Sequence, residues 1–256
     1  MRVLFAGRKF AGRDSLRWTH EQGLEVVGVL TDDFLPGSPC AALARELGLP
    51  TFTYEQAQHA IVEGSLAFDL GVSFVYWRIL RGPLLDHPAR GFINFHPAPL
   101  PALKGVGGYN VAILDGMTEY GVTAHYVDAG IDTGPIIELV PVALDPERDT
   151  ALSLEARSME AMEELYQRTL MRAAATSALL EMHENRGGRY VCRKEMEALK
   201  RIGRDDDAER KARAFWFPPY DGAYLEHGDT RHTVVPRAVL ESLGGRDTHL
   251  LMHSTR

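Results

Sequence analysis

An apolar strand pattern that ends in polar side chains runs through Phe92-Ile-Asn94-Phe-His96-Pro-Ala-Pro-Leu-Pro101. Strand side chains alternate between two faces, so Asn94 and His96 project on the same side. A second polar turn, Asp128-Ala-Gly-Ile-Asp132-Thr-Gly-Pro135, places Asp132 36 residues after His96. Acyl transfer develops an oxyanion and moves a proton, so it needs an amide donor, an imidazole and a charge to tune it. These three residues are therefore our candidate catalytic group.

Strand patterns alternate with helix patterns on the N-terminal side of this stretch. Apolar runs predict strands at residues 2–6, 26–30, 66–74 and 91–95, and helical spacing predicts helices at 14–22 and 38–47. Such alternation is typical of right-handed βαβ units, so we expect an α/β, Rossmann-like fold with a mostly parallel sheet. Ligands of these sheets bind beyond the carboxyl ends of the strands. Residues 74–77 and 94–96 both fall at such ends.

The C-terminal part of the chain has a different pattern. Residues 150–184 predict one long amphipathic helix, capped near Asp149 and ending before Gly187. The charged residues 201–211 predict a linker or loop, and residues 212–224 combine five aromatic side chains with Pro-Pro and Asp-Gly, which argues against a regular element. We therefore expect a catalytic domain over residues 1–185 and a small C-terminal subdomain, residues 186–256, of β-hairpin and loops.

The composition predicts a soluble globular protein of the cytoplasm. Of 256 residues, 45% are apolar and 25% are charged. No apolar run reaches the roughly 18 residues of a membrane helix, and the first residues resemble a strand more than a signal peptide. Two distant cysteines, Cys40 and Cys192, predict free thiols in a reducing compartment. The net charge of -7 disfavours nucleic acid as a partner.

The motifs of this region resemble those of the folate-dependent formyltransferases. They read Asn94-Phe-His96-Pro-Ala98-Pro99-Leu100-Pro101, Lys104-Gly105, Gly121-Val-Thr123-Ala-His125-Tyr-Val-Asp128 and Asp132-Thr-Gly134-Pro135. Ala98 and Pro99 depart from the Ser-Leu that is commoner in the family. The sequence His-Pro-Ala-Pro-Leu-Pro, followed by Lys-Gly-Val-Gly-Gly-Tyr-Asn, looks most like that of the nucleotide-sugar N-formyltransferases. The resemblance is specific over residues 70–140, looser before them and weak beyond 150.

The resemblance implies that the chain uses 10-formyltetrahydrofolate as co-substrate and no metal. Asn94 would donate to the developing oxyanion, His96 would stabilise it or carry the proton, and Asp132 would orient His96, raise its pKa or relay a proton. Whether His96 acts as acid, base or electrostatic partner stays open. His125 is expected either to support the Asp132 loop from a buried strand or to act directly. The spacing of these residues is not compact, which disfavours a zinc site.

The implied folate site lies between two segments that follow strands. A pterin is a flat ring with a donor and acceptor edge, which suits a narrow pocket with apolar walls and backbone partners. The expected folate-binding residues are Tyr76, Trp77, Arg78, Ile79, Leu80, Val127, Asp128 and Ile131.

The acceptor is expected to contact basic and glycine-rich segments. Lys104-Gly-Val-Gly-Gly-Tyr-Asn leads into an apolar helix at 111–114, where backbone amides and the lysine favour an anion. Residues 7–13 carry three basic side chains but no Gly-x-Gly-x-x-Gly, which disfavours a dinucleotide cofactor. The expected acceptor-binding residues are Arg8, Lys9, Lys104, Gly105, Tyr109 and Trp216. Each segment also has an alternative explanation that stays open. The glycines after Lys104 could simply turn the chain, the basic side chains of residues 7–13 could be solvated loop charges, and the aromatic cluster around Trp216 could dock the tail or a second subunit.

We therefore expect an N-formyltransferase that modifies the amine of a nucleotide-linked amino sugar, as in lipopolysaccharide or glycan biosynthesis. Three alternatives are formylation of glycinamide ribonucleotide, formylation of methionyl-tRNA, and a non-catalytic folate or nucleotide sensor. The phosphate loop of the first would be rich in Gly, Ser and Asn, and the second would require a large basic C-terminal domain. The sequence leaves open the sugar, the position of its amine, the base (dTDP, UDP or GDP) and whether the chain forms a homodimer.

Overall fold

The computed structural model describes residues 1–32, 35 and 37–244 of the chain. The strands are β1 Arg2–Gly7, β2 Glu25–Leu30, β3 Thr51–Phe52, β4 Leu70–Phe74, β5 Phe92–His96, β6 Leu103–Gly105, β7 Tyr120–Tyr126, β8 Ile136–Val142, β9 Arg189–Val191, β10 Tyr224–His227 and β11 Thr230–Thr233. The helices are α1 Lys9–Glu21, α2 Pro39–Glu46, α3 Tyr54–Val62, α4 Pro83–Asp86, α5 Gly108–Leu114, α6 Ala151–Ala174, α7 Arg193–Leu199, α8 Ala208–Ala214 and α9 Arg237–Gly244.

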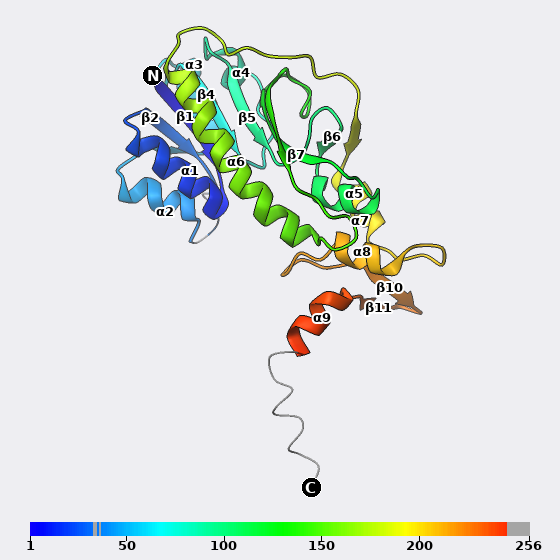
Figure 1. Cartoon of the computed structure of the whole chain (residues 1–256). Helices are drawn as coiled ribbons and strands as arrows, with labels where there is room; N and C mark the ends of the chain where they lie inside the picture. The colour runs from blue at the N-terminus through cyan, green and yellow to red at the C-terminus, as the bar shows by residue number, and fades with distance from the viewer. Residues whose placement is uncertain (33–34, 36, 245–256) are drawn as a thin grey trace. The chain divides into compact units, whose positions relative to one another are not determined.

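The main sheet has seven strands in the order β3-β2-β1-β4-β5-β7-β8 (Figure 1). The first five strands of this order run parallel, and β7 runs antiparallel to β5. The predicted α/β fold with a mostly parallel sheet is therefore confirmed. The chain winds outward in opposite directions from β1 and β4, and such a switch point is where these sheets bind ligands. Pairs β6-β9 and β10-β11 form two further small sheets.

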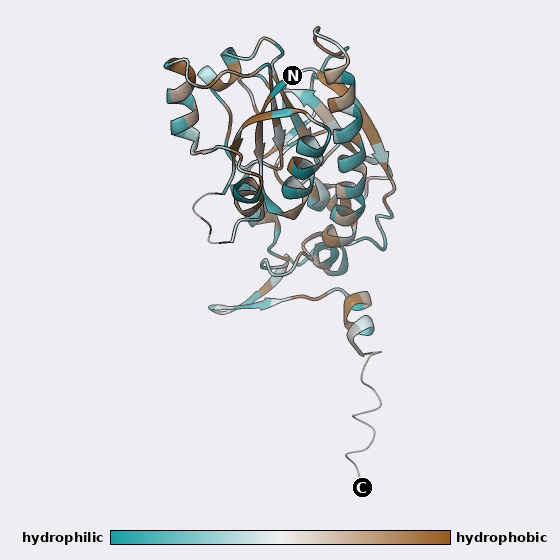
Figure 2. Ribbon diagram, turned by 90° about the vertical axis from the view of Figure 1, so that its left-hand side faces the viewer, coloured by the Kyte–Doolittle hydropathy of each residue, from teal (hydrophilic) through white to brown (hydrophobic). Residues whose placement is uncertain are grey.

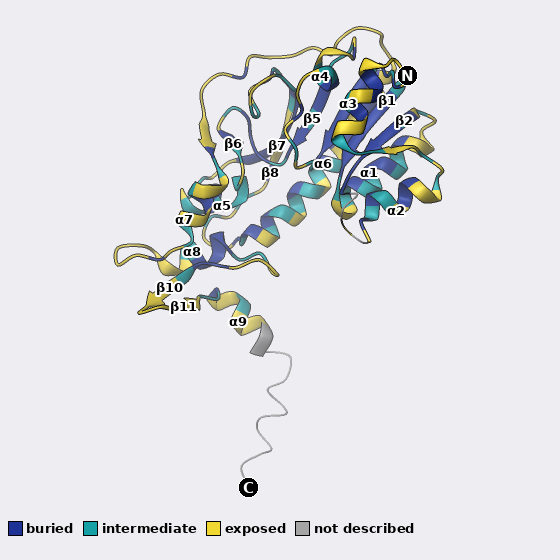
Figure 3. Ribbon diagram, turned by 180° about the vertical axis from the view of Figure 1, so that it is seen from behind, coloured by how far each residue is buried: buried dark blue, intermediate teal, exposed yellow. Residues whose placement is uncertain are grey.

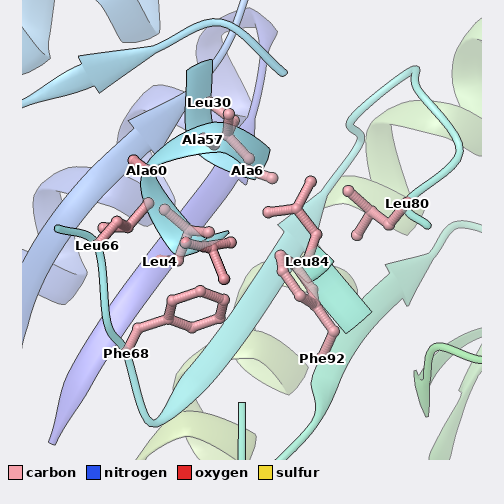
Figure 4. Close-up of a cluster of buried hydrophobic side chains, with 11 residues drawn as sticks. Leu4, Ala6, Leu30, Ala57, Ala60, Leu66, Phe68, Leu80, Leu84 and Phe92 are labelled. Carbon is pink, nitrogen blue, oxygen red and sulfur yellow. The ribbon is translucent and has the colours of Figure 1, made fainter. Parts of the chain in front are cut away.

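One face of the main sheet packs against α3 and α4. Leu4 and Ala6 alternate along β1 and point to this face, because strand side chains have period two. They meet Ala57 of α3 and Leu84 of α4 in a buried cluster (Figure 4). Helix α3 begins at this place because Thr53 and Gln56 form a capping box, in which each side chain bonds to the backbone N–H of the other.

The opposite face packs against α1 and α6. Phe5, between Leu4 and Ala6, points this way and lies 6.5 Å, ring centre to ring centre, from the fully buried Tyr166 of α6. The Tyr166 ring also contacts Trp18, Phe74 and Phe95. Burial on both faces explains why the central strands are hydrophobic runs (Figures 2 and 3).

The chain separates into two compact units of interleaved segments. One contains Met1–Gly105, Gly121–Val142 and Arg157–Tyr190, and the other contains Val106–Tyr120, Ala143–Ala156 and the chain from Val191. The second unit thus includes two segments that the sequence assigned to the first domain. The expected boundary at residue 185 stays a prediction, and residues 245–256 of the expected subdomain lie outside the described residues.

Several predicted elements have different limits in the structure. Helix α1 begins at Lys9 rather than at residue 14, and strand β4 begins at Leu70 rather than at residue 66. The helix expected over residues 150–184 ends at Ala174, because the backbone that follows bonds to strands of the sheet. Its cap is Thr150, whose Oγ1 accepts from the N–H of Ser153. Residues 208–211, expected in a loop, begin helix α8, because Asp207 accepts from the N–H of Arg210 as its cap. The expected hairpin is present as β10 and β11.

No helix in the described ranges is both long enough and apolar enough to cross a membrane. Cys40 is buried and Cys192 is half-buried, and both are free thiols.

Candidate functional site

Strand pairing places the first two site residues. Asn94 of β5 lies directly opposite His125 of the antiparallel strand β7, and His96 lies opposite Thr123. Residues opposite each other in an antiparallel pair share a face and lie close together. Asn94 Nδ2 is accordingly 3.0 Å from His125 Nε2. The rings of His96 and His125 lie edge to face, with centres 6.4 Å apart.

The loop between β7 and β8 brings a carboxylate to both imidazoles. Asp132 lies with Oδ2 3.6 Å from His96 Nδ1 and with Oδ1 3.6 Å from His125 Nε2. Its φ of +53° is rare for a residue other than glycine, so the loop must hold it there. The structure therefore brings Asn94, His96 and Asp132 together, as predicted from the sequence.

Backbone groups complete the site and fix the proton positions. His96 Nε2 lies 3.0 Å from the carbonyl oxygen of Leu103, and the N–H of Gly105 donates to Asp132 Oδ2 at 2.9 Å. His125 Nδ1 lies 2.8 Å from the carbonyl oxygen of Tyr126. A carbonyl only accepts, so His96 carries a proton on Nε2 and His125 carries one on Nδ1. His125 Nε2 thus faces both the Asn94 amide and Asp132 Oδ1, and the Asn94 amide has a second N–H for another acceptor.

Burial and charge act in opposite directions on the two titrating groups. Burial lowers the pKa of His96, and the charge of Asp132 offsets only part of that effect. Burial alone would raise the pKa of Asp132, but the two imidazoles and the N–H of Gly105 outweigh it and lower that pKa. At neutral pH the site therefore holds a neutral His96 and an ionised Asp132.

This arrangement is suited to moving one proton beside a developing negative charge. With Nε2 protonated, Nδ1 of neutral His96 is a base, and the imidazolium formed there would face the carboxylate. Asn94 is half-buried, so its amide reaches the open side of the site. No group of His, Cys, Asp and Glu side chains in the described residues has the arrangement of a metal site.

A cavity of about 390 Å³ lies beside the Asp132 loop. Val127 and Asp128, two predicted folate-binding residues, line it together with Arg81, Gly82, Leu85, Asp86 and Ala129. The Asp128 carboxylate accepts from the N–H of Gly130 and from the hydroxyl of Thr133, which folds this wall into a turn. The lining combines small and apolar residues with three charged ones, a mixture that suits a small molecule with polar groups.

The segment that follows β4 is organised by aromatic rings. The Arg78 guanidinium lies 4.4 Å from the ring centre of Tyr54 and 5.5 Å from that of Trp77, and it pairs with both oxygens of Glu55. Trp77 and Ile79 are exposed, whereas Leu80 is buried in the cluster under α3. The remaining predicted folate residues are Tyr76, whose ring lies 6.5 Å from that of Trp77, and the half-buried Ile131 of the Asp132 loop.

The predicted acceptor residues divide between the two units. Arg8 pairs with the buried Asp32 at 2.9 Å, and Lys9 follows it at the exposed start of α1 with a φ of +60°. Lys104 is buried. Gly105 serves through its N–H on Asp132. Tyr109 and Trp216 belong to the second unit. Tyr109 packs on Tyr120, and the backbone carbonyl of Trp216 accepts from the N–H of Leu152. The role of both residues in acceptor binding stays a prediction.

Several residues of the site had no signal in the sequence. The Leu103 carbonyl acts through the backbone, which no side-chain pattern reveals. Arg81, Gly82 and Leu85 line the cavity but lie in an irregular stretch and a one-turn helix. Asn185 donates to the carbonyl oxygens of Asp132 and Gly134 from more than 50 residues away. Only the strand pattern around His125 pointed to a supporting role.

Comparison with known proteins finds one matching family and relatives of similar sequence and fold. A model of the formyl transferase family matches residues 39–170, just over half of the chain. The methionyl-tRNA formyltransferase of Roseiflexus sp. (strain RS-1) is 34% identical over 162 residues, which cover 59% of this chain and 50% of that protein. The chain spans about half the length of the first curated relatives that it matches.

Two solved structures share the fold. The N-formyltransferase from Helicobacter canadensis, in complex with folinic acid and dTDP-3-aminofucose, superposes with a TM-score of 0.74 at 23% identity, over 90% of this chain and 85% of that chain. Phosphoribosylglycinamide formyltransferase from Bacillus halodurans superposes with a TM-score of 0.61 at 26% identity, over 69% of this chain and 97% of that chain.

Proposed function

This chain belongs to the formyl transferase family, and from that premise we propose that it transfers a formyl group from 10-formyltetrahydrofolate to the amine of a nucleotide-linked amino sugar. The observation that carries the activity is the cluster of Asn94, His96 and Asp132 at the carboxyl end of β5. Its three groups lie within hydrogen-bonding or ion-pairing reach of one another or of His125.

The donor carries the formyl group on a nitrogen that acts as the leaving group. The side chains of the site stabilise the developing negative charge and transfer the proton. Asn94 donates its second N–H to the formyl oxygen as negative charge develops there during attack by the amine. His96 Nδ1 takes the proton that the amine loses, and Asp132 stabilises the resulting imidazolium. His96 then gives the proton to the departing nitrogen, so the site returns to its starting state.

The donor would lie against the cavity wall of Val127 and Asp128. The same loop continues from this wall to Asp132, which contacts His96, so we place the formyl group of the donor on the His96 side of the cavity. The cavity volume of about 390 Å³ is in the range of small-molecule sites.

Three features support a nucleotide-linked acceptor. The resemblance of residues 94–110 is to nucleotide-sugar enzymes, and the structure from Helicobacter canadensis holds dTDP-3-aminofucose. Lys104 is a mostly buried basic residue of β6, next to Gly105, whose N–H donates to Asp132. Its ammonium would pair with a diphosphate held beside the site.

The test is formylation of a panel of dTDP-, UDP- and GDP-linked amino sugars, with release of tetrahydrofolate as the readout. We expect turnover with one nucleotide class and loss of turnover in Asp132→Ala, with folding retained. Failure to formylate any of the panel, with folate binding intact, would overturn the acceptor class.

The curated relatives favour one other acceptor, methionyl-tRNA. The same donor chemistry would serve it, because only the amine differs. A parallel assay with charged initiator tRNA separates the two acceptors.

A further inference from the structure

An irregular segment after α6 runs along the loops of the site. We call residues 175–190 the return segment. Its backbone bonds to the site region at several places: the N–H of Leu180 donates to the Tyr126 hydroxyl, His183 and Ile136 exchange two bonds, and the N–H of Arg189 donates to the Ala102 carbonyl. The segment therefore contacts the chain on both sides of the catalytic cluster.

Asn185 is the residue of this segment whose side chain reaches the Asp132 loop. Its Nδ2 donates to the carbonyl oxygen of Asp132 at 3.0 Å and to that of Gly134 at 2.8 Å. The residue is 9% exposed, and its Oδ1 is buried with no hydrogen-bond partner among the described residues. Both amide hydrogens are thus used on two carbonyls of one turn, at the cost of an unpaired oxygen.

The turn that Asn185 holds is constrained from its other side. A side chain at Gly134 would collide with the backbone carbonyl of Tyr126, so the turn lies flat against the end of β7. Asp132 has a φ of +53°, which costs about 1 kcal/mol or more and persists only when the surroundings enforce it. Tyr126 blocks one direction of movement, and the Asn185 amide ties the carbonyl of Asp132 itself.

We propose that Asn185 is a positioning residue that keeps the Asp132 carboxylate between His96 and His125. The inference rests on the proposed function for its catalytic meaning, although its structural effect on the histidines does not need turnover. A primary amide is suited to this role because its two N–H groups bridge two carbonyls at once. A carboxylate in its place would face two carbonyl oxygens with no hydrogen to donate.

The experiment compares Asn185→Leu and Asn185→Asp with Glu184→Gln, a matched change at the exposed neighbour. Imidazole resonances of His96 are followed by NMR against pH in each folded variant. The Asp132 charge raises the pKa of His96, so its loss from this place lowers the midpoint further. We expect the His96 midpoint to fall by about 0.5 pH unit or more in Asn185→Leu, to fall less in Asn185→Asp because the new carboxylate itself raises the pKa of a nearby imidazole, and to stay unchanged in Glu184→Gln.

Kinetics give a second readout once an acceptor is known. A carboxylate displaced by about 1 Å should lower kcat on the order of 100-fold while KM for the folate changes little. An unchanged His96 midpoint in folded Asn185→Leu, or an unchanged kcat with a lower Tm, would show a merely structural residue and overturn the proposal. Should neither variant fold, Asn185→Ser, which keeps one donor, is measured by the same titration and decides in the same way.

The two proposals fail in different ways. If wild type formylates no amino sugar but the His96 midpoint moves in the Asn185 variants, the acceptor is wrong and the positioning role stands. If turnover occurs and the midpoint does not move, the positioning role is wrong and the function stands.

Discussion

At the scale of single residues, the site depends on which nitrogen of His96 is free. The Leu103 carbonyl holds the proton on Nε2, which leaves Nδ1 toward Asp132. A base placed in this way contributes about 100- to 10,000-fold to rate in proton-transfer steps. The proposed role of His96 as base therefore depends on a backbone atom that no sequence motif contains.

The first prediction concerns the loss of this base. His96→Ala should lower kcat by about 100-fold or more, because the proposed acceptor of the amine proton is then missing. Steady-state formylation with the best amino sugar measures it, with unfolding curves to check the fold. The control is His20→Ala, an exposed histidine of α1, which should keep full activity. A His96→Ala variant with near wild-type kcat would remove His96 from the mechanism.

The second prediction concerns stability against pH. The pKa of buried His96 is below its ordinary value of 6.5, so below pH 6.5 the unfolded chain binds a proton that the folded chain does not. The free energy of unfolding should therefore fall as the pH drops from 6.5 toward the lowered pKa. The lowered pKa of Asp132 adds a stabilisation that is present above its ordinary value of 3.8 and lost at more acidic pH.

Urea unfolding from pH 7.5 to 5 measures the His96 contribution. His96→Gln, which cannot titrate, should flatten the slope below pH 6.5. An identical slope in both proteins would mean that folding does not change the pKa of His96.

The sequence predicted the side chains of the site better than their supports. Asn94 and His96 could be paired because strand periodicity is short-range and strand ends bind ligands. Asp132 could be added to this pair because it lies in the motif Asp132-Thr-Gly134-Pro135. Leu103 and Asn185 could not be found, since the first acts through its backbone and the second lies on a segment whose path is set by tertiary contacts. Gly105 was predicted to bind the acceptor, but its backbone bond to Asp132 could not be predicted.

At the scale of elements, the return segment shows why the predicted helix was too long. Polar and apolar residues continue at helical spacing beyond Ala174, so the pattern alone predicts helix. The backbone instead bonds to Tyr126, to Ile136 and to Ala102, and Arg90 donates to the carbonyl of Ala173 at the end of α6. Tertiary bonds outweighed a propensity of a few tenths of a kcal/mol per residue.

The third prediction uses two adjacent glycines of this segment. Gly187 and Gly188 have φ of +78° and +79°, so alanine at either position meets the same backbone strain, about 1–2 kcal/mol. Gly187 has open space around its Cα, but a Cβ on Gly188 would overlap the carbonyl oxygen of Pro101. Gly188→Ala should therefore lower the free energy of unfolding by more than about 3 kcal/mol, well beyond the loss in Gly187→Ala.

Urea denaturation of both variants measures this difference. Equal losses would mean that the segment does not press against Pro101. A larger loss in Gly188→Ala, accompanied by reduced kcat in the folded fraction, would show that the contact also maintains the site.

At the scale of the whole molecule, each of the two compact units is made of stretches that are separated in the sequence. Strand and helix patterns are local, so the sequence predicted the α/β class and the alternation of strands and helices in the first half. The segments Val106–Tyr120 and Ala143–Ala156 join the second unit, together with the chain from Val191, through contacts between residues far apart in sequence. A single boundary at residue 185 therefore cannot separate these two units.

The fourth prediction concerns net charge and separates the two acceptors that the relatives suggest. Binding of tRNA gains most of its affinity by neutralising phosphates with Lys and Arg. This chain carries 28 basic and 35 acidic residues, a net charge of -7, so its long-range field repels a polyanion. We expect no retardation of initiator tRNA in a native gel at about 10 μM protein and about 150 mM salt, where non-specific binders begin to bind.

A nucleotide diphosphate carries few charges and needs only a local cation such as Lys104. Stabilisation by a nucleotide diphosphate at 100 times its Kd should reach about 2.7 kcal/mol, and Lys104→Met should remove most of it. Salt-sensitive retardation of tRNA together with formylation of its methionyl amine would instead mean that a local basic surface overrides the net charge, and the acceptor would then be methionyl-tRNA.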